Sequence, residues 1–578
     1  MQSHPIVILL CMRLWAATSF AQVSSWESET AAGRQAYQRQ SYAEAENHFN
    51  DALRRATEFG ESDLRFSTAL NNLAAAKHAE GKYADAEAIY HRALAICERV
   101  FGPEDREVAT LLNNLGMLLK EKARYSEAEP SLQRALGIRE KALGPDHLDV
   151  AVVLSNLAAL RKDEGKFLEA ESLFRRAIAI SARTLGPASP DVATILNNLG
   201  TLLQAEHKFS EAEPMFQRAL AIWEKDFGPD HPQVATALNN LASVLQEQGK
   251  YSDVEPMFQR ALAIWEKRFG PEHPGVATAL NNLAFFLQGQ GNYGEAEPLF
   301  ERGLAIRVKS LGPEAPEVAT ILINLARNYD LRGRYKEAEG FYQRALAISS
   351  KAVTPQHRQE ANILIGLGKL QREEGQYTAA ESFFRRALAI QEREFGQENT
   401  EVALVLSNLG LVEYLRHDYS DAESFYMRAL SMWDEASGVS SLNLASTLEN
   451  LGVLYFDQRR YDEAGRLFDR AVTINERALG QEHPDVARGL TKLARADLAR
   501  GYYAEAEVPC QRALHILEKA SQPDYTALIE VLMNYALVLE KTKRKAEAEL
   551  LQTRAMVYRA KLQENRAKNQ TAFSADRP

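Results

Sequence analysis

The chain has very few cysteines for its length. Only Cys11, Cys97 and Cys510 occur among its 578 residues. The two sulfur atoms of a disulfide require Cα atoms within a few ångströms of each other. Cys97 and Cys510 lie near opposite ends of the sequence, so we expect no disulfide between them in an extended array. The stability of the fold must therefore come from side-chain packing.

The sequence also lacks a long apolar run. A membrane-spanning helix needs about 18 or more apolar residues, and the sequence predicts a soluble mature protein without a membrane span. The one targeting candidate is residues 1–21, where the apolar run Ile6–Met12 precedes Ser19-Phe20-Ala21, a small-x-small cleavage pattern. We expect this segment to be a signal peptide and the protein to be periplasmic or extracellular. Because Arg13 interrupts the segment and no Lys or Arg precedes it, a cytoplasmic protein is the alternative.

Positive charge is not in excess. The chain has 68 Lys and Arg against 78 Asp and Glu, with a formal net charge of −10. Proteins that bind nucleic acid usually carry a basic face, so we predict no nucleic-acid partner. The motifs G-x-x-x-x-G-K-[ST], H-E-x-x-H and G-x-S-x-G are also absent. We therefore expect no enzymatic activity, no catalytic residue, no metal and no cofactor.

What the sequence does contain is a small residue that returns at a nearly constant spacing of 42. Only the first step, at 41, departs from this period. Such a period marks a repeat array, in which each unit buries its apolar face against its neighbours. The column consists of Ala45, Ala86, Ala128, Ala170, Ala212, Val254, Ala296, Ala338, Ala380, Ala422, Ala464, Ala506 and Ala548.

One unit, residues 232–273, shows the local pattern. Apolar residues at helical spacing predict a first helix over about 234–245 and a second over about 254–265. Gly249 suits the left-handed cap of the first helix. Gly270-Pro271 ends the second, because proline cannot continue a helix. Histidines at the next helix start fit helix capping better than a metal or acid–base site. They are His147, His231, His273 and His483.

Two further columns predict how the helices pack. Small residues let two helix axes approach closely, and a large ring fills the space that remains. The small column on the first helix is Ala74, Gly116, Ala158, Gly200, Ala242, Ala284, Ala326, Gly368, Gly410, Gly452, Ala494 and Ala536. The ring column on the second helix is Tyr90, Leu132, Phe174, Phe216, Phe258, Phe300, Tyr342, Phe384, Tyr426 and Phe468.

These columns resemble the tetratricopeptide repeat family. The 42-residue period, with LNNLA, EAEP and LGPDHP, is similar to its kinesin-light-chain-type branch, over roughly residues 26–566. The resemblance implies an all-α fold: an α-solenoid of about 13 units over 22–566, coiled as a right-handed superhelix with its first helices on the concave side. We expect a disordered tail at 567–578. Departures occur near the C-terminus, where Lys492 replaces an asparagine, Cys510 and Gln552 replace the ring, and Gly438-Val439-Ser440 replaces the Gly-Pro loop.

Asparagines recur inside the first helices, although asparagine is a mediocre helix former. We predict that they form a ladder of amides along a peptide-binding groove, offering donors and acceptors to an extended peptide; the resemblance supports this use. Two alternatives remain open: the amides tie one repeat to the next, or recent duplication copied them. The predicted groove asparagines are Asn71, Asn113, Asn114, Asn197, Asn198, Asn239, Asn240, Asn281, Asn282 and Asn324.

The same face changes character further along the chain. Arg327 and Lys369 appear where earlier repeats have neutral residues, and Arg372 follows Lys369 after one turn. Basic side chains on one face suit an acidic or amphipathic segment, so we predict that a ligand contacts these three residues. Drift in older repeats is the alternative.

Together these patterns predict a protein–protein interaction scaffold that binds a peptide or an extended protein segment in a concave groove. One alternative is a regulatory sensor whose coil tightens on a ligand, which requires different affinities for two states. Another is a non-catalytic subunit of an enzyme complex.

Overall fold

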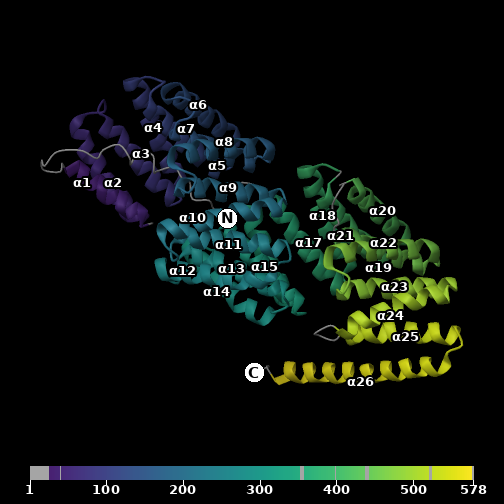
Figure 1. Cartoon of the computed structure of the whole chain (residues 1–578). Coiled ribbons are helices and arrows are strands. Elements are labelled where there is room, and N and C mark those ends of the chain that lie inside the picture. The colour runs from purple at the N-terminus through teal and green to yellow at the C-terminus, as the bar shows by residue number, and fades with distance from the viewer. Residues whose placement is uncertain are drawn as a thin grey trace. The chain divides into compact units, whose positions relative to one another are not determined.

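The computed structural model describes residues 25–39, 41–351, 357–397, 399–435, 442–519 and 524–575. Within these ranges it contains 26 α-helices, two short 3₁₀ segments (Thr57–Phe59 and Tyr251–Asp253) and no strand (Figure 1). The predicted signal peptide at 1–21, with Cys11, and the segment Gly438–Ser440 lie outside the described residues. The fold is an all-α solenoid, as the period predicted.

The helices alternate between the first and second members of successive hairpins. The first helices are α1 (Ser25–Gln38), α3 (Leu64–Ala79), α5 (Arg106–Glu121), α7 (Leu148–Asp163), α9 (Pro190–Ala205), α11 (Pro232–Glu247), α13 (Pro274–Gly289), α15 (Pro316–Leu331), α17 (His357–Glu373), α19 (Thr400–Leu415), α21 (Leu442–Asp457), α23 (Pro484–Arg500) and α25 (Tyr525–Lys541). The second helices are α2 (Tyr42–Ala56), α4 (Tyr83–Phe101), α6 (Tyr125–Leu143), α8 (Phe167–Leu185), α10 (Phe209–Phe227), α12 (Val254–Phe269), α14 (Tyr293–Leu311), α16 (Tyr335–Lys351), α18 (Tyr377–Phe395), α20 (Tyr419–Glu435), α22 (Tyr461–Leu479), α24 (Tyr503–Lys519) and α26 (Lys545–Ala575).

The chain forms two compact units, unit 1 up to Asn328 and unit 2 from Tyr329. Within each unit, a second helix packs against its own first helix and against the first helix that follows. Successive first helices also touch one another, as α5 and α7 do in unit 1 and α19 and α21 in unit 2. Across the described ranges, successive second helices share no contact of that extent. The hairpins are therefore most closely spaced along the side formed by the first helices, which we call the first-helix face.

In most hairpins the core is a ring packed on a small residue, as predicted. A Cβ atom built on Gly200 would lie 2.7 Å from Cε1 of Phe216, closer than any real contact allows. The same holds for Gly368 against Phe384. Because the glycine leaves this space empty, the buried ring can rest directly on the backbone of the first helix.

The turns after second helices such as α10 and α12 depend on glycine. Gly228 has φ +86° and ψ 164°, and Gly270 has φ +86° and ψ 165°. This backbone region is accessible essentially to glycine alone. The predicted end of the second helix at Gly270-Pro271 is therefore confirmed.

The loop histidines cap helix N-termini. Nδ1 of His147 accepts a hydrogen bond from the backbone N–H of Asp149 at 3.1 Å, and His231 accepts one from Gln233 at 3.4 Å. His273 and His483 accept from Gly275 and Asp485 in the same way. Among the described residues no group of His, Cys, Asp and Glu side chains is arranged to hold a metal ion. The capping interpretation is confirmed.

We expect the His231 cap to make the stability of α11 depend on pH. Burial, together with nearby Arg268, lowers the pKa of His231 from its ordinary value of 6.5. Since the folded-state pKa lies below that of the unfolded chain, this stabilisation is complete above about pH 6.5 and is lost as the pH falls toward the folded pKa. Protonated Nδ1 cannot accept from Gln233, and its charge lies at the positive end of the helix dipole.

The variant His231→Asn retains a side-chain acceptor but cannot be protonated. Urea unfolding between about pH 8 and about pH 5 should therefore show a smaller loss of unfolding free energy in this variant than in the wild type. Equal pH slopes in the two proteins would contradict the assignment.

The last helix, α26, extends from Lys545 to Ala575. The sequence from Lys545 to Ala575 contains no proline or glycine to end the helix.

Cys97 and Cys510 are buried and free, and burial raises the pKa of the Cys510 thiol to about 12. No helix in the described ranges is long and apolar enough to cross a membrane.

Candidate binding face on the first helices

The predicted asparagines bond to one another between successive hairpins. Nδ2 of the second asparagine in one hairpin donates to Oδ1 of the first asparagine in the hairpin before it. We call each such bond an amide rung. The rungs are Asn114 to Asn71 (2.8 Å), Asn156 to Asn113 (2.8 Å), Asn240 to Asn197 (2.9 Å), Asn282 to Asn239 (3.0 Å) and Asn324 to Asn281 (2.9 Å).

The rungs explain why a mediocre helix former recurs inside these helices. Asn114 and Asn240 are each only 1% exposed. A buried amide without a partner costs about 1–3 kcal/mol, whereas a paired one contributes about 0.5–1.5 kcal/mol. Each rung therefore ties one first helix to the next. This matches the alternative in which the amides join successive repeats.

The rungs do not use every polar atom of the asparagines. Nδ2 of Asn197 and of Asn239 makes no hydrogen bond to any residue that the structure describes, whereas Nδ2 of Asn113 and of Asn281 donates weakly to the neighbouring asparagine at 3.3 Å. The peptide-binding role of these asparagines stays a prediction.

One rung is absent from unit 1. At the junction of α7 and α9, Ser155 stands at the position of the first asparagine, 43 residues before Asn198, which is the spacing of the rungs. The Ser155 hydroxyl is buried without a hydrogen-bond partner. The Asn198 side chain is partly exposed, and no hydrogen bond joins it to another described residue.

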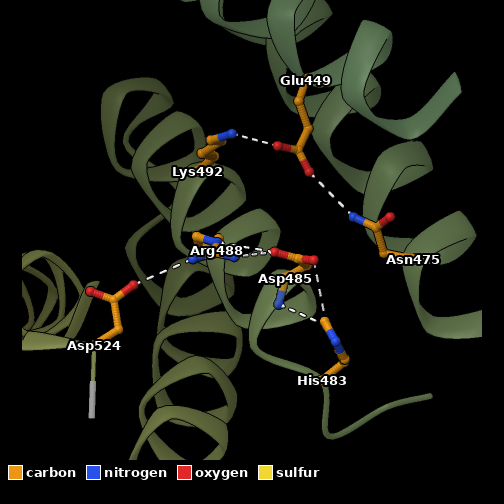
Figure 2. Close-up of polar contacts among 7 residues, drawn as sticks. All are labelled: Glu449, Asn475, His483, Asp485, Arg488, Lys492 and Asp524. Carbon is orange, nitrogen blue, oxygen red and sulfur yellow. Dashed lines mark hydrogen bonds and ion pairs between the residues drawn. The ribbon is translucent and has the colours of Figure 1, made fainter. Parts of the chain in front are cut away.

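In unit 2 the same position carries an ion pair instead of an amide rung. Nζ of Lys492 lies 2.5 Å from Oε2 of Glu449, and the two residues are 43 apart, the spacing of every amide rung (Figure 2). Oε1 of Glu449 also accepts a hydrogen bond from Asn475 at 3.3 Å. The departure at Lys492 is thus matched by a carboxylate in the preceding hairpin.

Helix α23 carries a row of basic side chains that the sequence analysis missed. Arg488, Lys492 and Arg495 are spaced by four and three residues, which places them on one side of the helix. Arg488 pairs with Asp485 and lies 3.3 Å from Asp524 (Figure 2). The Arg495 guanidinium lies 4.4 Å from the centre of the Phe456 ring. The helical spacing was the available signal, and these contacts show that the row is largely engaged within the protein.

The three basic residues predicted from the sequence differ in their surroundings. Arg327 on α15 is exposed, and no ion pair or hydrogen bond joins its side chain to another described residue. Lys369 and Arg372 lie one turn apart on α17 in unit 2. Arg372 forms an ion pair with Glu373 at 2.6 Å and donates to Oδ1 of Asn408 at 3.5 Å. Arg327 is therefore the basic side chain of the three with the greatest freedom to meet a ligand.

Arginines on the second helices have a different role. Arg260 pairs with Glu224 of the preceding hairpin at 2.7 Å and donates to the carbonyl oxygen of Pro229 at 3.1 Å. Arg302 makes the equivalent contacts with Glu266 and Pro271. These guanidinium groups clamp successive hairpins together on the side away from the first-helix face.

Comparison with known families places this repeat. The family model described as tetratricopeptide repeat matches residues 65–141, 124–183, 149–225, 191–267, 275–351, 324–393, 359–435 and 443–519, and a second model of the same description matches 30–99. The chain belongs to the tetratricopeptide repeat family. These repeats indicate a protein–protein interaction scaffold, and proteins built from them are typically non-catalytic.

Several solved structures are similar to parts of this tetratricopeptide repeat protein. A structure of BtubC (BKLC) from P. vanneervenii is 27% identical, covers 40% of this chain and 91% of its own, and has a TM-score of 0.34. A putative kinesin light chain with nearly identical TPR-like repeats from Podosopora anserina is 28% identical, covers 36% and 97%, and has a TM-score of 0.31. A variant of that protein is 27% identical, covers 34% and 93%, and has a TM-score of 0.31. No curated protein matches the sequence.

Proposed function

We propose that this scaffold holds an extended segment of a protein partner, acidic or amphipathic in character, along its first-helix face. The observation that carries the proposal is the contrast between two kinds of arginine. Second-helix arginines such as Arg260 are bound to carboxylates and carbonyls of the neighbouring hairpin. Arg327 is exposed on the first-helix face and has no such partner among the described residues.

The chemistry of the face supports this proposal. A guanidinium group is a strong, directional donor to carboxylates, and Arg327 keeps its donors available. The free Nδ2 groups of Asn197 and Asn239 are suited to main-chain carbonyl oxygens of an extended segment. In unit 2, Lys369 and Arg372 add positive charge on α17. The proposal needs no catalytic residue, cofactor or nucleic acid.

Charge reversal tests the proposal. In the variant Arg327→Glu, Lys369→Glu, Arg372→Glu, repulsion of an acidic segment should weaken partner binding at least about tenfold, which corresponds to about 1.4 kcal/mol. Partners are first identified by affinity capture with the wild-type chain, and the affinity of the purified partner is then measured by calorimetry.

The matched control reverses three exposed basic residues of second helices: Lys225→Glu, Arg344→Glu, Arg466→Glu. It changes the net charge equally and should bind like the wild type. Circular dichroism confirms that both variants remain helical. Unchanged affinity in the first variant would refute the proposed contacts.

A further inference from the structure

The hairpin of α25 and α26 exposes apolar side chains at the end of the described array. The two helices pack against each other in unit 2 (Figure 1). Met533 and Leu537 on α25 are 43% and 41% exposed, and Met556 on α26 is 61% exposed. Terminal hairpins of a repeat array normally carry a polar outer surface, which keeps the array soluble. Three exposed apolar side chains on one such hairpin therefore call for an explanation.

The repeat period shows that these side chains occupy positions at which hairpins meet. Met556 stands two periods after Val472, whose buried side chain packs so closely on the next first helix that a Cβ atom on Gly489 would lie 2.8 Å from its Cγ2. Met533 stands two periods after Glu449, which forms an ion pair with the next first helix. Leu537 lies one turn from Met533 on the same side of α25. The last hairpin thus exposes the side that earlier hairpins turn toward their successor.

Two charged side chains of α26 lie at junction positions as well. Glu549 stands one period after Glu507, which pairs with Arg544 of the next hairpin at 2.6 Å. Arg559 stands ten periods after Arg139, which pairs with a buried carboxylate of the next first helix. Glu549 and Arg559 are both exposed, and no ion pair joins the side chain of either to another described residue. Each therefore lacks the opposite charge that its counterpart receives from the next hairpin.

The two charged residues make this side of α26 complementary to itself. Glu549, Met556 and Arg559 are spaced by seven and three residues, which places them on one side of the helix. Glu549 and Arg559 are separated by about 15 Å along the helix axis. When two α26 helices lie antiparallel about a two-fold axis midway between these residues, each Glu549 meets Arg559 of the other copy. Both ion pairs then form at once, with Met556 near the centre of the contact.

We propose that two copies of this chain associate through their last hairpins, with the same surface used by both copies. This surface, the end face, consists of Met533, Leu537, Glu549, Met556 and Arg559. The apolar side chains of the two copies bury one another, and the two ion pairs fix the antiparallel orientation. Such a contact closes on itself and gives a dimer. The inference does not depend on the proposed function.

The N-terminal hairpin of another copy is a poorer match for the end face. The exposed residues of α1 that are spaced by three and four positions are Ser28, Ala31 and Gln35. They offer neither a large apolar side chain to Met556 nor a carboxylate to Arg559. The end face itself offers both.

Sedimentation equilibrium of the full chain over a series of concentrations should show a monomer–dimer equilibrium. Met556→Glu should raise the dissociation constant of the dimer at least about tenfold, because it places a charge in the apolar part of the contact. Leu550→Glu is the matched control on the same helix, where Leu550 is 63% exposed on another side. It adds the same charge and should leave the dissociation constant unchanged. Circular dichroism confirms that both variants remain helical.

Charge reversal tests the antiparallel arrangement. Glu549→Arg alone and Arg559→Glu alone each turn both ion pairs of the dimer into repulsions, so each should raise the dissociation constant at least about tenfold. An equimolar mixture of the two variants should form a heterodimer as tight as the wild-type dimer, because two basic groups of one variant then face two acidic groups of the other. Mixing would not reverse a merely structural effect of either substitution on its own chain.

The outcomes are distinct. A wild-type chain that stays monomeric at every concentration overturns the inference. A dimer that Leu550→Glu disrupts and Met556→Glu does not is held by a different surface, which also overturns it. If the mixed charge variants do not associate, the two α26 helices are not paired as proposed. None of these results changes the standing of the proposed function, since partner binding is measured separately.

Discussion

Replacing Asp149 by alanine is expected to lower the free energy of unfolding by about 3–5 kcal/mol, the usual cost of breaking a buried ion pair. Asp149, in the first turn of α7, pairs with Arg139 of α6, and each residue is 8% exposed. Arg139 also donates to Oγ1 of Thr110 at 2.5 Å. Without the carboxylate, a guanidinium that cannot lose its proton stays buried with the Thr110 hydroxyl as its remaining hydrogen-bond partner among the described residues and Glu107 as the nearby opposite charge. Urea unfolding followed by circular dichroism measures the loss.

A double variant provides the control. Two repeats further along, Trp223 and Gln233 occupy the positions of Arg139 and Asp149, and Trp223 is buried. The variant Arg139→Trp, Asp149→Gln copies that arrangement, with a buried ring and an uncharged amide, so neither charge of the pair is left without the other; replacing a whole buried ion pair is often close to neutral. It should recover most of the stability that Asp149→Ala loses. An Asp149→Ala variant as stable as the wild type would show that the pair contributes nothing.

Replacing Phe216 by alanine should cost about 3–5 kcal/mol, the range for deleting a buried phenylalanine ring. Phe216 is 0% exposed and rests on Gly200, which has no side chain to fill the resulting cavity. Because the stability of an array is set by neighbouring repeats, the effect should be local. Hydrogen exchange should accelerate in α9 and α10 far more than in α3 and α4.

The matched control for this prediction is Phe216→Leu. In the hairpin of α5 and α6, Leu132 occupies the ring column and packs on Gly116 in the same way. A leucine at 216 should therefore cost less than about 1.5 kcal/mol, as volume-conserving apolar changes usually do. Equal losses for alanine and leucine would contradict the packing argument.

The local structure of each hairpin could be predicted from the sequence. These signals act within one repeat or at its edge: the small and ring columns, Gly270 at the helix end and the capping histidines. In each case the residue type itself indicates the conformation or the packing. Repetition then makes the same signal appear many times. The segment that ends α26 contains no helix breaker, and the disorder expected at 567–578 stays a prediction.

Contacts between repeats were much harder to predict. An amide rung joins residues 43 apart, one more than the period, and this offset arises from the way two first helices lie against each other. The sequence shows where the asparagines are, but it does not show which pairs of them form hydrogen bonds. For the same reason the sequence did not identify Glu449 as the partner of Lys492, or Ser155 as the residue that interrupts the series of rungs. The effect of a serine in a column of asparagines can be judged only when the residue across the junction between the two first helices is known.

The predicted binding residues fall into two groups. Most of the asparagines lie in rungs between repeats, while Asn198 and Arg327 have no partner among the described residues. The sequence alone could not separate these groups, because the residue type does not show whether a side chain is hydrogen-bonded in the fold. Their binding roles remain predictions, and the charge-reversal variant above tests that of Arg327.

Each rung has a direction, with the donor always in the later hairpin. Excision of residues 239–280 by recombination would bring Asn282 opposite Asn197, and the donor would still meet its acceptor. Residues 209–250 and 251–292 agree at 32 of 42 positions, as recently exchanged segments would. Whole repeats can therefore be gained or lost while every rung keeps a matched donor and acceptor, so the number of repeats can evolve separately from the stability of each junction.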